Sequence, residues 1–372
     1  MSFQKFNISG PILDALQEKG YTQPTPIQQQ AIPAILSGSD VLASAQTGTG
    51  KTASFSIPLL QILSEKKGTH GIRGLVLAPT RELAIQVSEN LNQYGKNLSI
   101  RTVLVYGGVS QVSQVNQIRR GVDVVIATPG RLLDLIQQRV VNLSQLNILV
   151  LDEADRMLDM GFIKDVKRIL ELVPQNCQKV FLSATMPDEV QRLVASMLRN
   201  PVRIKIASEK STLRIQQGVY YVAREDKKAL LKHVIAEQQM RNVLVFTRTK
   251  FGADKVARDL SKSGIAAEAF HGDKSQGARQ RSLSNFKKNA TRVLVATDIA
   301  ARGIDISDLP FVINYEMPDT VETYTHRIGR TGRAGNAGAA LSFCDHEEKG
   351  QLRNLNRMSP GKIEVLKHPF AN

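Results

Sequence analysis

The sequence contains little cysteine, no tryptophan and no long apolar run. Its 372 residues include only two cysteines, Cys177 and Cys344, and neither belongs to a Cys-x-x-Cys pair. We therefore predict neither a disulfide framework nor a zinc site, and this cysteine usage fits a reducing cytoplasm. No run approaches the ~20 apolar residues that a membrane helix needs. Residues 1–5 lack the apolar stretch of a signal peptide.

The charge is strongly unbalanced, with 49 Lys and Arg against 34 Asp and Glu and a net charge of +15. Such an excess favours a polyanionic partner: nucleic acid first, an anionic membrane second, with a merely soluble basic protein as the alternative. The missing apolar run weakens the membrane interpretation. Aromatic residues are only 5% of the chain, which argues against a base-stacking platform as the main nucleic-acid surface and favours backbone contacts.

Short apolar runs recur along the chain, and each is followed by a loop and a helical pattern. They are rich in Val, Ile and Leu and do not alternate with polar residues, which is typical of strands buried on both faces of a parallel sheet. The fold class predicted is therefore α/β. The runs are 41–43, 74–78, 103–106, 124–127, 148–151 and 180–182 in the first half, and 243–246, 266–270, 293–296, 311–314 and 339–343 in the second.

The two halves resemble each other. The run 75–81 (LVLAPTR) is similar to 243–248 (VLVFTR), and 124–131 (VVIATPGR) is similar to 293–298 (VLVATD). The length also suits two domains. We predict domains at 1–206 and 217–372, joined by a polar linker at 207–216. The alternative is a surface loop inside one large domain.

A glycine-rich turn between a strand and a helix predicts a phosphate site. The run 41–52 reads VLASAQTGTGKT and matches the pattern G-x-x-x-x-G-K-[ST], except that alanine stands at the first glycine. Its backbone N–H groups would face phosphate oxygens, its lysine would neutralise the β and γ phosphates, and its last threonine would hold Mg²⁺. A plain strand–helix turn is the alternative. The loop residues are Ala45, Gln46, Thr47, Gly48, Thr49, Gly50, Lys51 and Thr52.

An acidic cluster follows the apolar run 148–151, at the edge of an α/β sheet where ligands bind. Asp152 is placed to bind Mg²⁺ through water, and Glu153 to orient and deprotonate the attacking water. Asp155 could link the site to its surroundings through hydrogen bonds. Solvated charges at a helix N-terminus are the alternative, which the glycine-rich loop makes less attractive.

The sequence Asp-Glu-Ala-Asp at 152–155 resembles the signature of the DEAD-box RNA helicases, and further motifs of that family occur in order from Phe3 to Phe343. The runs 247–250 (TRTK) and 271–276 (HGDKSQ) look most like the bacterial RhlE-type subgroup. The resemblance implies two RecA-like domains and an ATP hydrolase that uses ATP and Mg²⁺ to unwind short RNA duplexes. It also implies a monomeric core, with ribosomal or RNA-decay proteins as possible partners.

The resemblance assigns roles to further residues. Adenine would be recognised by the run 20–28, and Arg330 and Arg333 would be arginine fingers that stabilise the transferring phosphoryl group. The coupling of hydrolysis to strand separation would involve Asp155, Ser183, Thr185 and His326. Further nucleotide contacts would be Phe3, Tyr21, Gln28, Gly303 and Asp305. The RNA contacts would be Pro79, Thr80, Arg81, Gly108, Thr128, Gly130, Arg131, Thr247, Arg248, Gln276, Arg279 and Thr297.

Three hypotheses follow from the sequence. The first is an RNA-dependent ATPase that unwinds short duplexes. The second is an RNA clamp that binds ATP but turns it over poorly, which the set of Lys51, Glu153, Arg330 and Arg333 weighs against. The third is a DNA motor, and only RNA offers the 2′-hydroxyl that would distinguish it.

Overall fold

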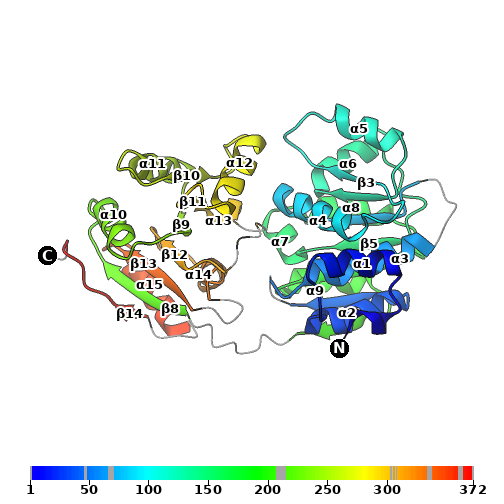
Figure 1. Ribbon diagram of the computed structural model, residues 1–372, viewed down its shortest axis with the longest axis horizontal. Helices are drawn as coiled ribbons and strands as arrows, with labels where there is room; N and C mark the ends of the chain where they lie inside the picture. Colours follow the sequence, from blue (N-terminus) through cyan, green and yellow to red (C-terminus); the bar gives the residue numbers. More distant parts are fainter. Residues whose placement is uncertain are drawn as a thin grey trace. The chain divides into compact units, whose positions relative to one another are not determined.

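A computed structural model gives the structure of the chain (Figure 1). It describes residues 2–45, 48–65, 71–206, 215–301, 304, 306, 308–332, 337–358 and 363–370. The chain divides into two compact units, Met1–Glu209 and Lys210–Asn372, which we call unit 1 and unit 2. Most of the predicted linker lies outside the described residues. Its last two residues, Ile215 and Gln216, do not belong to a linker, because they begin a strand of unit 2.

Unit 1 contains a sheet of seven parallel strands in the order β3-β4-β2-β5-β6-β1-β7. Every apolar run predicted as a strand in this half forms one, with bounds that agree within two residues at each end. The strands are β1 (Val41–Ser44), β2 (Gly74–Leu77), β3 (Thr102–Val105), β4 (Val124–Ala127), β5 (Ile148–Leu151), β6 (Gln178–Ser183) and β7 (Val202–Lys205).

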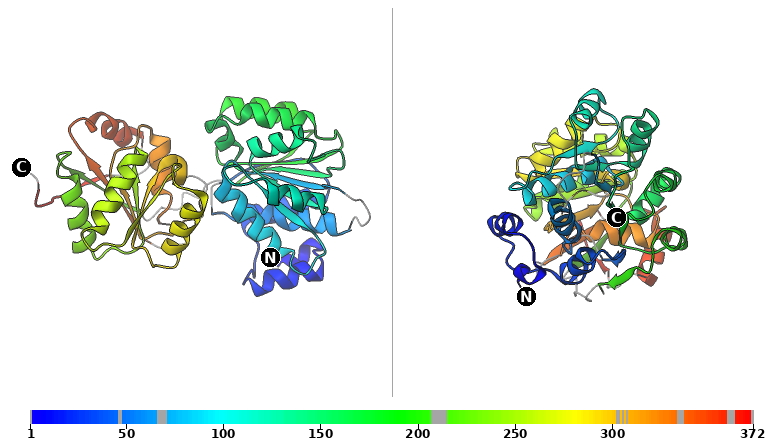
Figure 2. Two further views of the ribbon diagram at one scale, coloured as in Figure 1. Left: turned by 90° about the horizontal axis from the view of Figure 1, so that it is seen from above. Right: turned by 90° about the vertical axis from the view of Figure 1, so that its right-hand side faces the viewer.

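Helices cover both faces of this sheet (Figure 2). Alternate residues of each strand point to opposite faces, so Val76 and Val150 belong to one core and Leu75 and Leu149 to the other. The first core is closed by α1–α4 and the second by α5–α9. The helices are η1 (Phe3–Phe6), α1 (Gly10–Glu18), α2 (Pro26–Leu36), α3 (Lys51–Glu65), α4 (Arg81–Tyr94), α5 (Val112–Arg119), α6 (Pro129–Gln137), α7 (Ala154–Asp159), α8 (Ile163–Glu171) and α9 (Asp188–Met197).

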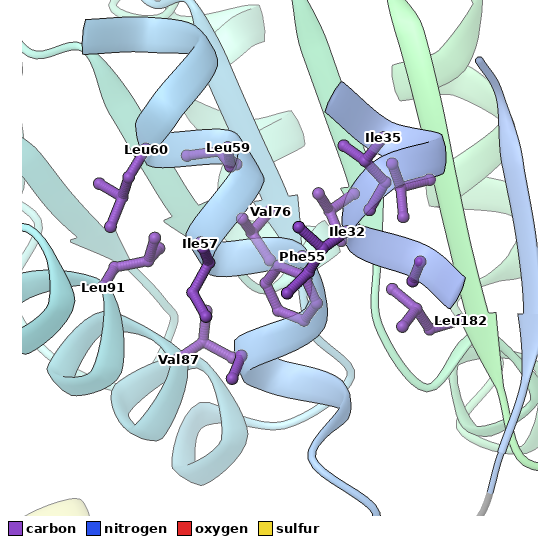
Figure 3. Close-up of a cluster of buried hydrophobic side chains, with 14 of the residues drawn as sticks. Ile32, Ile35, Phe55, Ile57, Leu59, Leu60, Val76, Val87, Leu91 and Leu182 are labelled. Carbon is purple, nitrogen blue, oxygen red and sulfur yellow. The ribbon is translucent and has the colours of Figure 1, made fainter. Parts of the chain in front are cut away.

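Helix α3 is the most deeply buried helix of this core. Phe55, Ile57, Leu59 and Leu60 are all buried, and Figure 3 shows them between side chains of α2, α4 and the sheet. A helix that is apolar on nearly all sides must be enclosed by protein. The core therefore fixes the helix whose first residue is Lys51.

Unit 2 contains a second sheet of seven parallel strands, in the order β10-β11-β9-β12-β13-β8-β14. The five apolar runs predicted as strands in this half are confirmed as β9–β13, and β8 and β14 complete the sheet. The strands are β8 (Ile215–Tyr221), β9 (Val243–Thr247), β10 (Ala267–Phe270), β11 (Val293–Thr297), β12 (Phe311–Asn314), β13 (Gly338–Cys344) and β14 (Glu364–Val365). The helices are α10 (Lys227–Glu237), α11 (Lys250–Ser261), α12 (Gln276–Lys287), α13 (Asp298–Ala301), α14 (Val321–Ile328) and α15 (Lys349–Met358).

The two sheets have the same topology. Numbered from one within each unit, the strands follow the order 3-4-2-5-6-1-7 in both. Strand β8 therefore corresponds to β1, β12 to β5 and β13 to β6. The similarity of the two halves that the sequence indicated is a repeat of one α/β domain type, and the predicted fold class is confirmed.

Candidate active site and nucleic-acid interface

The glycine-rich loop follows β1 in unit 1. The backbone N–H of Ala45 donates to the Ser183 carbonyl (3.1 Å), which fastens the start of the loop to β6. Gln46 and Thr47 lie outside the described residues, and Thr49 and Thr52 are half-buried. Gly48 and Gly50 both have positive φ angles, 88° and 91°.

Gly50 also has no room for a side chain. A Cβ there would collide with the Gln28 amide and the Thr25 hydroxyl. Gln28 is buried; its Nε2 donates to the Gly50 carbonyl (3.2 Å) and its Oε1 accepts from the Thr25 N–H (2.9 Å). Gln28 therefore holds the loop and caps α2 at the same time. These two bonds leave one donor and one acceptor position on the amide for an adenine edge.

Lys51 is buried although it carries a positive charge. It begins α3, and its Nζ has no hydrogen-bond partner among the described residues. An unpaired ammonium group in a protein interior costs several kcal/mol. The positive end of α3 adds to its charge, so this position is prepared for an anion.

Asp152 lies in the same part of unit 1, directly after β5, and is 2% exposed. Its Oδ1 has no partner among the described residues. Burial raises the pKa of its carboxyl to about 7, while the Lys51 charge acts to lower it and the Glu153 charge to raise it. A divalent cation would reverse this shift, so the carboxylate fits Mg²⁺.

The described residues contain no cluster of three or more His, Cys, Asp or Glu that could hold a metal by itself. Mg²⁺ does not require such a cluster, because one or two carboxylates suffice when phosphates supply other ligands.

Glu153 follows Asp152 and directly precedes α7. Its φ of 52° and ψ of 54° place it in the left-handed region, which turns the chain sharply into α7. The side chain is buried and forms an ion pair with the Arg156 guanidinium. The sequence did not predict this ion pair.

Asp155 connects the acidic cluster with the loop after β6. Its Oδ2 accepts from both the N–H and the hydroxyl of Thr185 (2.8 Å each). The Ser183 hydroxyl in turn accepts from the Asp155 N–H (3.3 Å) and donates to the Thr185 carbonyl (2.7 Å). The three residues therefore form one hydrogen-bonded group, as the predicted link between Asp155 and its surroundings required.

The two aromatic residues expected near adenine lie in different surroundings. Phe3 is 3% exposed and contacts Phe6 and Tyr21, each with ring centroids 6.2 Å apart. Tyr21 is half-buried, and its hydroxyl lies 3.0 Å from that of Tyr94. Burial raises the pKa of Tyr94, so Tyr94 remains neutral and can donate. Phe3 is thus mainly a core residue that supports Tyr21.

The RNA-contact candidates of unit 1 gather at the carboxyl ends of β2, β3 and β4. Thr80 caps α4 by accepting from the Leu83 N–H (3.2 Å), after the buried Pro79. The Arg81 guanidinium lies directly against Gly108, whose φ is 77° and where any Cβ would collide with it. Arg131 donates to the Val109 carbonyl (3.3 Å). Thr128 is buried before α6, and Gly130 is exposed in its first turn.

The RNA-contact candidates of unit 2 occupy the same positions in their sheet. Thr247 and Thr297 end β9 and β11, and Gln276 begins α12. Arg279 lies over the Phe270 ring, with the guanidinium carbon 5.6 Å from the centroid. Arg248 is exposed, but it already has acidic partners. Its backbone N–H donates to Glu316 (2.6 Å), and its guanidinium lies near Glu348 (3.5 Å) and Asp319 (3.8 Å).

The arginine-rich run 326–333 is divided between core and surface. His326 is exposed. Arg330 is buried and its Nη1 donates to the Ile304 carbonyl (2.8 Å). Arg327, which was not predicted to have a role, is 2% exposed and forms a bidentate ion pair with Asp298 (2.6 and 2.7 Å). Gly303, Asp305 and Arg333 lie outside the described residues.

Two further predictions concern absences. Within the described residues, no helix is sufficiently long and apolar to pass through a bilayer. Both cysteines are free and buried. Burial raises the pKa of Cys177 to about 12 and that of Cys344 to about 11, so neither thiol is reactive at neutral pH.

Comparison with known proteins agrees with this geometry. Residues 25–193 match the family model "DEAD/DEAH box helicase" and residues 226–335 match "Helicase conserved C-terminal domain". The chain is 42% identical over 370 residues to the DEAD-box ATP-dependent RNA helicase CshA of Bacillus subtilis, covering 99% of the chain and 74% of that protein. It is 41% identical over 372 residues to RhpA of Helicobacter pylori, covering 100% and 75%.

Solved structures are similar over the full length. Saccharomyces cerevisiae Dbp5 bound to RNA and ADP BeF3 matches with a TM-score of 0.87 and 29% identity, covering 98% of this chain and 95% of that one. A DEAD box protein from Methanococcus jannaschii matches with a TM-score of 0.57 and 39% identity, covering 99% of both. The chain belongs to the DEAD-box family of ATP-dependent RNA helicases.

Proposed function

We propose that this chain couples RNA-stimulated ATP hydrolysis to the local opening of short RNA duplexes. The observation that carries the proposal is the pair of buried, opposite charges in unit 1, Lys51 and Asp152, which have free polar atoms within the described residues. A protein interior tolerates such atoms poorly unless a ligand completes them. A nucleoside triphosphate with Mg²⁺ offers both the anion and the cation that they need.

The nucleotide would be held mainly by unit 1. Backbone N–H groups of residues 45–50 and the Lys51 ammonium group would bind its phosphates, and Gln28 would pair with the adenine edge. Thr52 and Asp152 would hold Mg²⁺, which would draw charge from the phosphate oxygens. Gly303 and Asp305 would add contacts from unit 2.

Hydrolysis would require groups from both units. Glu153 would orient the attacking water and accept its proton, after its carboxylate exchanges part of the Arg156 contact for that water. Arg330 and Arg333 would stabilise the charge that develops on the transferring phosphoryl group. Arg330 would have to exchange its bond to the Ile304 carbonyl for the phosphate. Nucleotide and RNA would then favour the same closed state of the two units.

RNA would be gripped by its backbone. Arg81 and Arg131 of unit 1 and Thr247 and Thr297 of unit 2 suit phosphate and 2′-hydroxyl groups, which carry little sequence information. Loss of the γ-phosphate would change the hydrogen bonds among Asp155, Ser183 and Thr185, and this change would alter the RNA contacts. His326 would have the corresponding role in unit 2. This grip would weaken steeply with salt.

We also propose finer assignments that rest on the sequence. The runs 247–250 and 271–276 support an RhlE-type protein. The absence of cysteine pairs supports a cytoplasmic protein, and the size of each core supports a monomer. Its partners would be RNA-rich assemblies, such as ribosome-assembly or RNA-decay complexes.

The test is ATP turnover with and without single-stranded RNA, and with DNA of the same sequence as the matched control. We expect RNA, and not DNA, to raise turnover several-fold, and a short duplex to open only when ATP is present. ATP turnover that stays low and does not change when RNA is added would favour the clamp hypothesis. Equal stimulation by DNA would favour a DNA motor.

A further inference from the structure

Unit 2 contains a cavity of about 690 Å³ at the carboxyl edge of its sheet. Its lining includes residues that follow β8, β9, β12 and β13, among them Arg224, Arg248, Glu316 and Asp345. Strands β8, β12 and β13 correspond to β1, β5 and β6 of unit 1, whose carboxyl ends carry the nucleotide site. The cavity thus occupies in unit 2 the topological position that the nucleotide site has in unit 1.

This cavity is not built for a triphosphate. Lys227 begins α10 as Lys51 begins α3, but its Nζ is paired with Asp345 (3.0 Å) and with Glu348. The loop before it, 222–226, contains no glycine, so it lacks the tight turn with which a glycine-rich loop directs several backbone N–H groups at a chain of phosphates. Its volume nevertheless lies in the usual range for ligand sites.

The part of the lining that α10 and α11 contribute (both helices are labelled in Figure 1) contains four lysines, Lys227, Lys228, Lys232 and Lys255, and one carboxylate, Asp259. Lys228 and Lys232 lie one turn apart on α10, and Lys255 and Asp259 one turn apart on α11. The hydrogen bond from Lys228 holds the pKa of Asp259 below its usual value, and the charges of Lys232 and Lys255 add to this effect. Lys228 forms an ion pair with Asp259 (2.9 Å), whereas in the described part of the chain neither Lys232 nor Lys255 has an ion-pair partner at contact distance.

An exposed aromatic ring stands beside these lysines. Phe251, in the first turn of α11, lines the cavity and is 76% exposed, more than any other large apolar side chain that the structure describes. Tyr315 lines the cavity too. The whole lining carries six basic and six acidic residues, so the attraction for a phosphate is local to Lys232 and Lys255. The exposed ring beside them offers a stacking face to a base, and the two together match a nucleotide unit.

The cavity also adjoins the RNA-contact candidates. Thr247 ends β9, and the next residues, Arg248 and Thr249, line the cavity. Thr247 itself is fully buried, whereas Arg248 and Thr249 are exposed. A strand that passes from the end of β11 across the neighbouring end of β9 therefore meets these two residues and reaches the cavity by continuing in the same direction.

We propose that this cavity is an additional RNA subsite, in which a base of the bound strand stacks on Phe251 while Lys232 and Lys255 hold its phosphate. The proposal rests on the proposed function, because it extends the RNA path of the same helicase. It commits to a strand of RNA rather than a free nucleotide, since the site continues that path.

The experiment measures the affinity of the full chain for uridine strands of increasing length, with a non-hydrolysable ATP analogue present. Wild type should gain affinity when the strand becomes long enough to reach Phe251. Phe251→Ala should lower the affinity for long strands about tenfold and leave the affinity for the shortest binding strand unchanged. Phe251→Tyr keeps the ring and should behave like wild type. Lys232→Ala with Lys255→Ala should lower the salt dependence for long strands only.

Matched controls lie in unit 1. Leu172→Ala removes an exposed apolar side chain, and Lys164→Ala with Lys167→Ala removes two lysines of α8. Neither change should alter how RNA affinity depends on strand length. A photoreactive uridine should crosslink to residues 250–255 only in long strands. Three results would overturn the subsite. Phe251→Ala could lose RNA affinity equally at all strand lengths, it could lose none at any length, or free uridine monophosphate could suppress the crosslink.

Failure of the subsite and failure of the proposed function give different results. A wild-type chain that RNA does not stimulate contradicts both. A wild-type chain that RNA stimulates, with Phe251→Ala unchanged at every length, contradicts the subsite alone and leaves this face to another partner.

Discussion

The two units share one topology but use the first lysine of the corresponding helix in opposite ways. Lys51 at the start of α3 and Lys227 at the start of α10 are both buried, and both follow the first strand of their sheet. Lys51 has no hydrogen-bond partner among the described residues, whereas Lys227 is paired with two carboxylates. The fold therefore supplies the position, and the neighbouring side chains decide whether it binds a ligand or stabilises the protein.

This difference has an energetic meaning. An uncompensated ammonium group destabilises the free protein, and that energy is recovered when an anion binds. A lysine that is already paired with carboxylates, such as Lys227, recovers no such energy from an anion. Unit 1 keeps its charges available for a ligand, whereas the corresponding loop of unit 2, 222–226, contains no glycine. On the proposed function, unit 2 contributes arginines to the nucleotide instead.

The largest effect should come from the group that unit 2 contributes. Arg330→Ala should lower RNA-stimulated turnover by about 10³-fold or more, because it removes charge stabilisation of the transition state. RNA affinity should change far less. Steady-state turnover and RNA binding are measured on the same preparation, with thermal unfolding as the folding control because Arg330 is buried. Equal losses of turnover and affinity would make Arg330 an RNA contact.

On the proposed function, the complementary group of unit 1 is the base, Glu153. Glu153→Gln should leave ATP binding intact and lower turnover by about 10³-fold, since an amide cannot accept the proton from water. Arg156→Lys is the matched control, because it preserves the charge next to Glu153. Single-turnover hydrolysis with separate nucleotide binding checks this, and normal turnover of Glu153→Gln would remove it as the base.

A smaller effect should follow from the link between the acidic cluster and the β6 loop. Thr185→Val removes the hydroxyl that donates to Asp155 and keeps the backbone bond. Duplex opening per ATP hydrolysed should fall about tenfold, in line with one lost hydrogen bond to a charged group. Thr185→Ser keeps the hydroxyl and should behave like wild type. An unchanged coupling ratio in Thr185→Val would exclude this link.

The smallest effect concerns the pH dependence of the paired lysine in unit 2. Burial alone would raise the pKa of Asp345, but the hydrogen bond and charge of Lys227 outweigh it and hold the pKa below 3.8. A lowered pKa stabilises the fold above the unfolded value, and this stabilisation is lost as pH falls through the folded value. Urea unfolding from about pH 6 to 3 should therefore show a shallower acid loss for Asp345→Asn than for wild type. Parallel curves would contradict the pairing.

Much of the fold followed from local pattern. The run 148–151 is uniformly apolar, and a strand with such a pattern must be covered on both faces, so its place inside a parallel sheet was predictable. Lys51 and Asp152 were predictable as site candidates because a phosphate loop and a strand-end carboxylate each have a recognisable sequence context. Strand β14 was not, because two exposed residues carry no periodicity.

The remaining features depend on contacts between distant residues. Arg327 and Arg330 look alike in sequence, yet Arg327 is enclosed by Asp298 from 29 residues away. Nothing local to Lys227 shows that Glu348, 121 residues later, neutralises it. The side-chain bonds of Gln28 and the ion pair of Arg156 likewise depend on how the chain folds back on itself.

The most direct test compares Lys51→Met with Lys227→Met in ATP binding and thermal unfolding. Lys51→Met should weaken ATP binding by about a hundredfold and leave the unfolding temperature equal or higher, because an unpaired buried charge is removed. Lys227→Met should keep ATP affinity but lose about 3–5 kcal/mol of stability, because two buried carboxylates are left without their partner. If Lys227→Met instead weakened ATP binding as much as Lys51→Met, the distinction between the two units would be wrong.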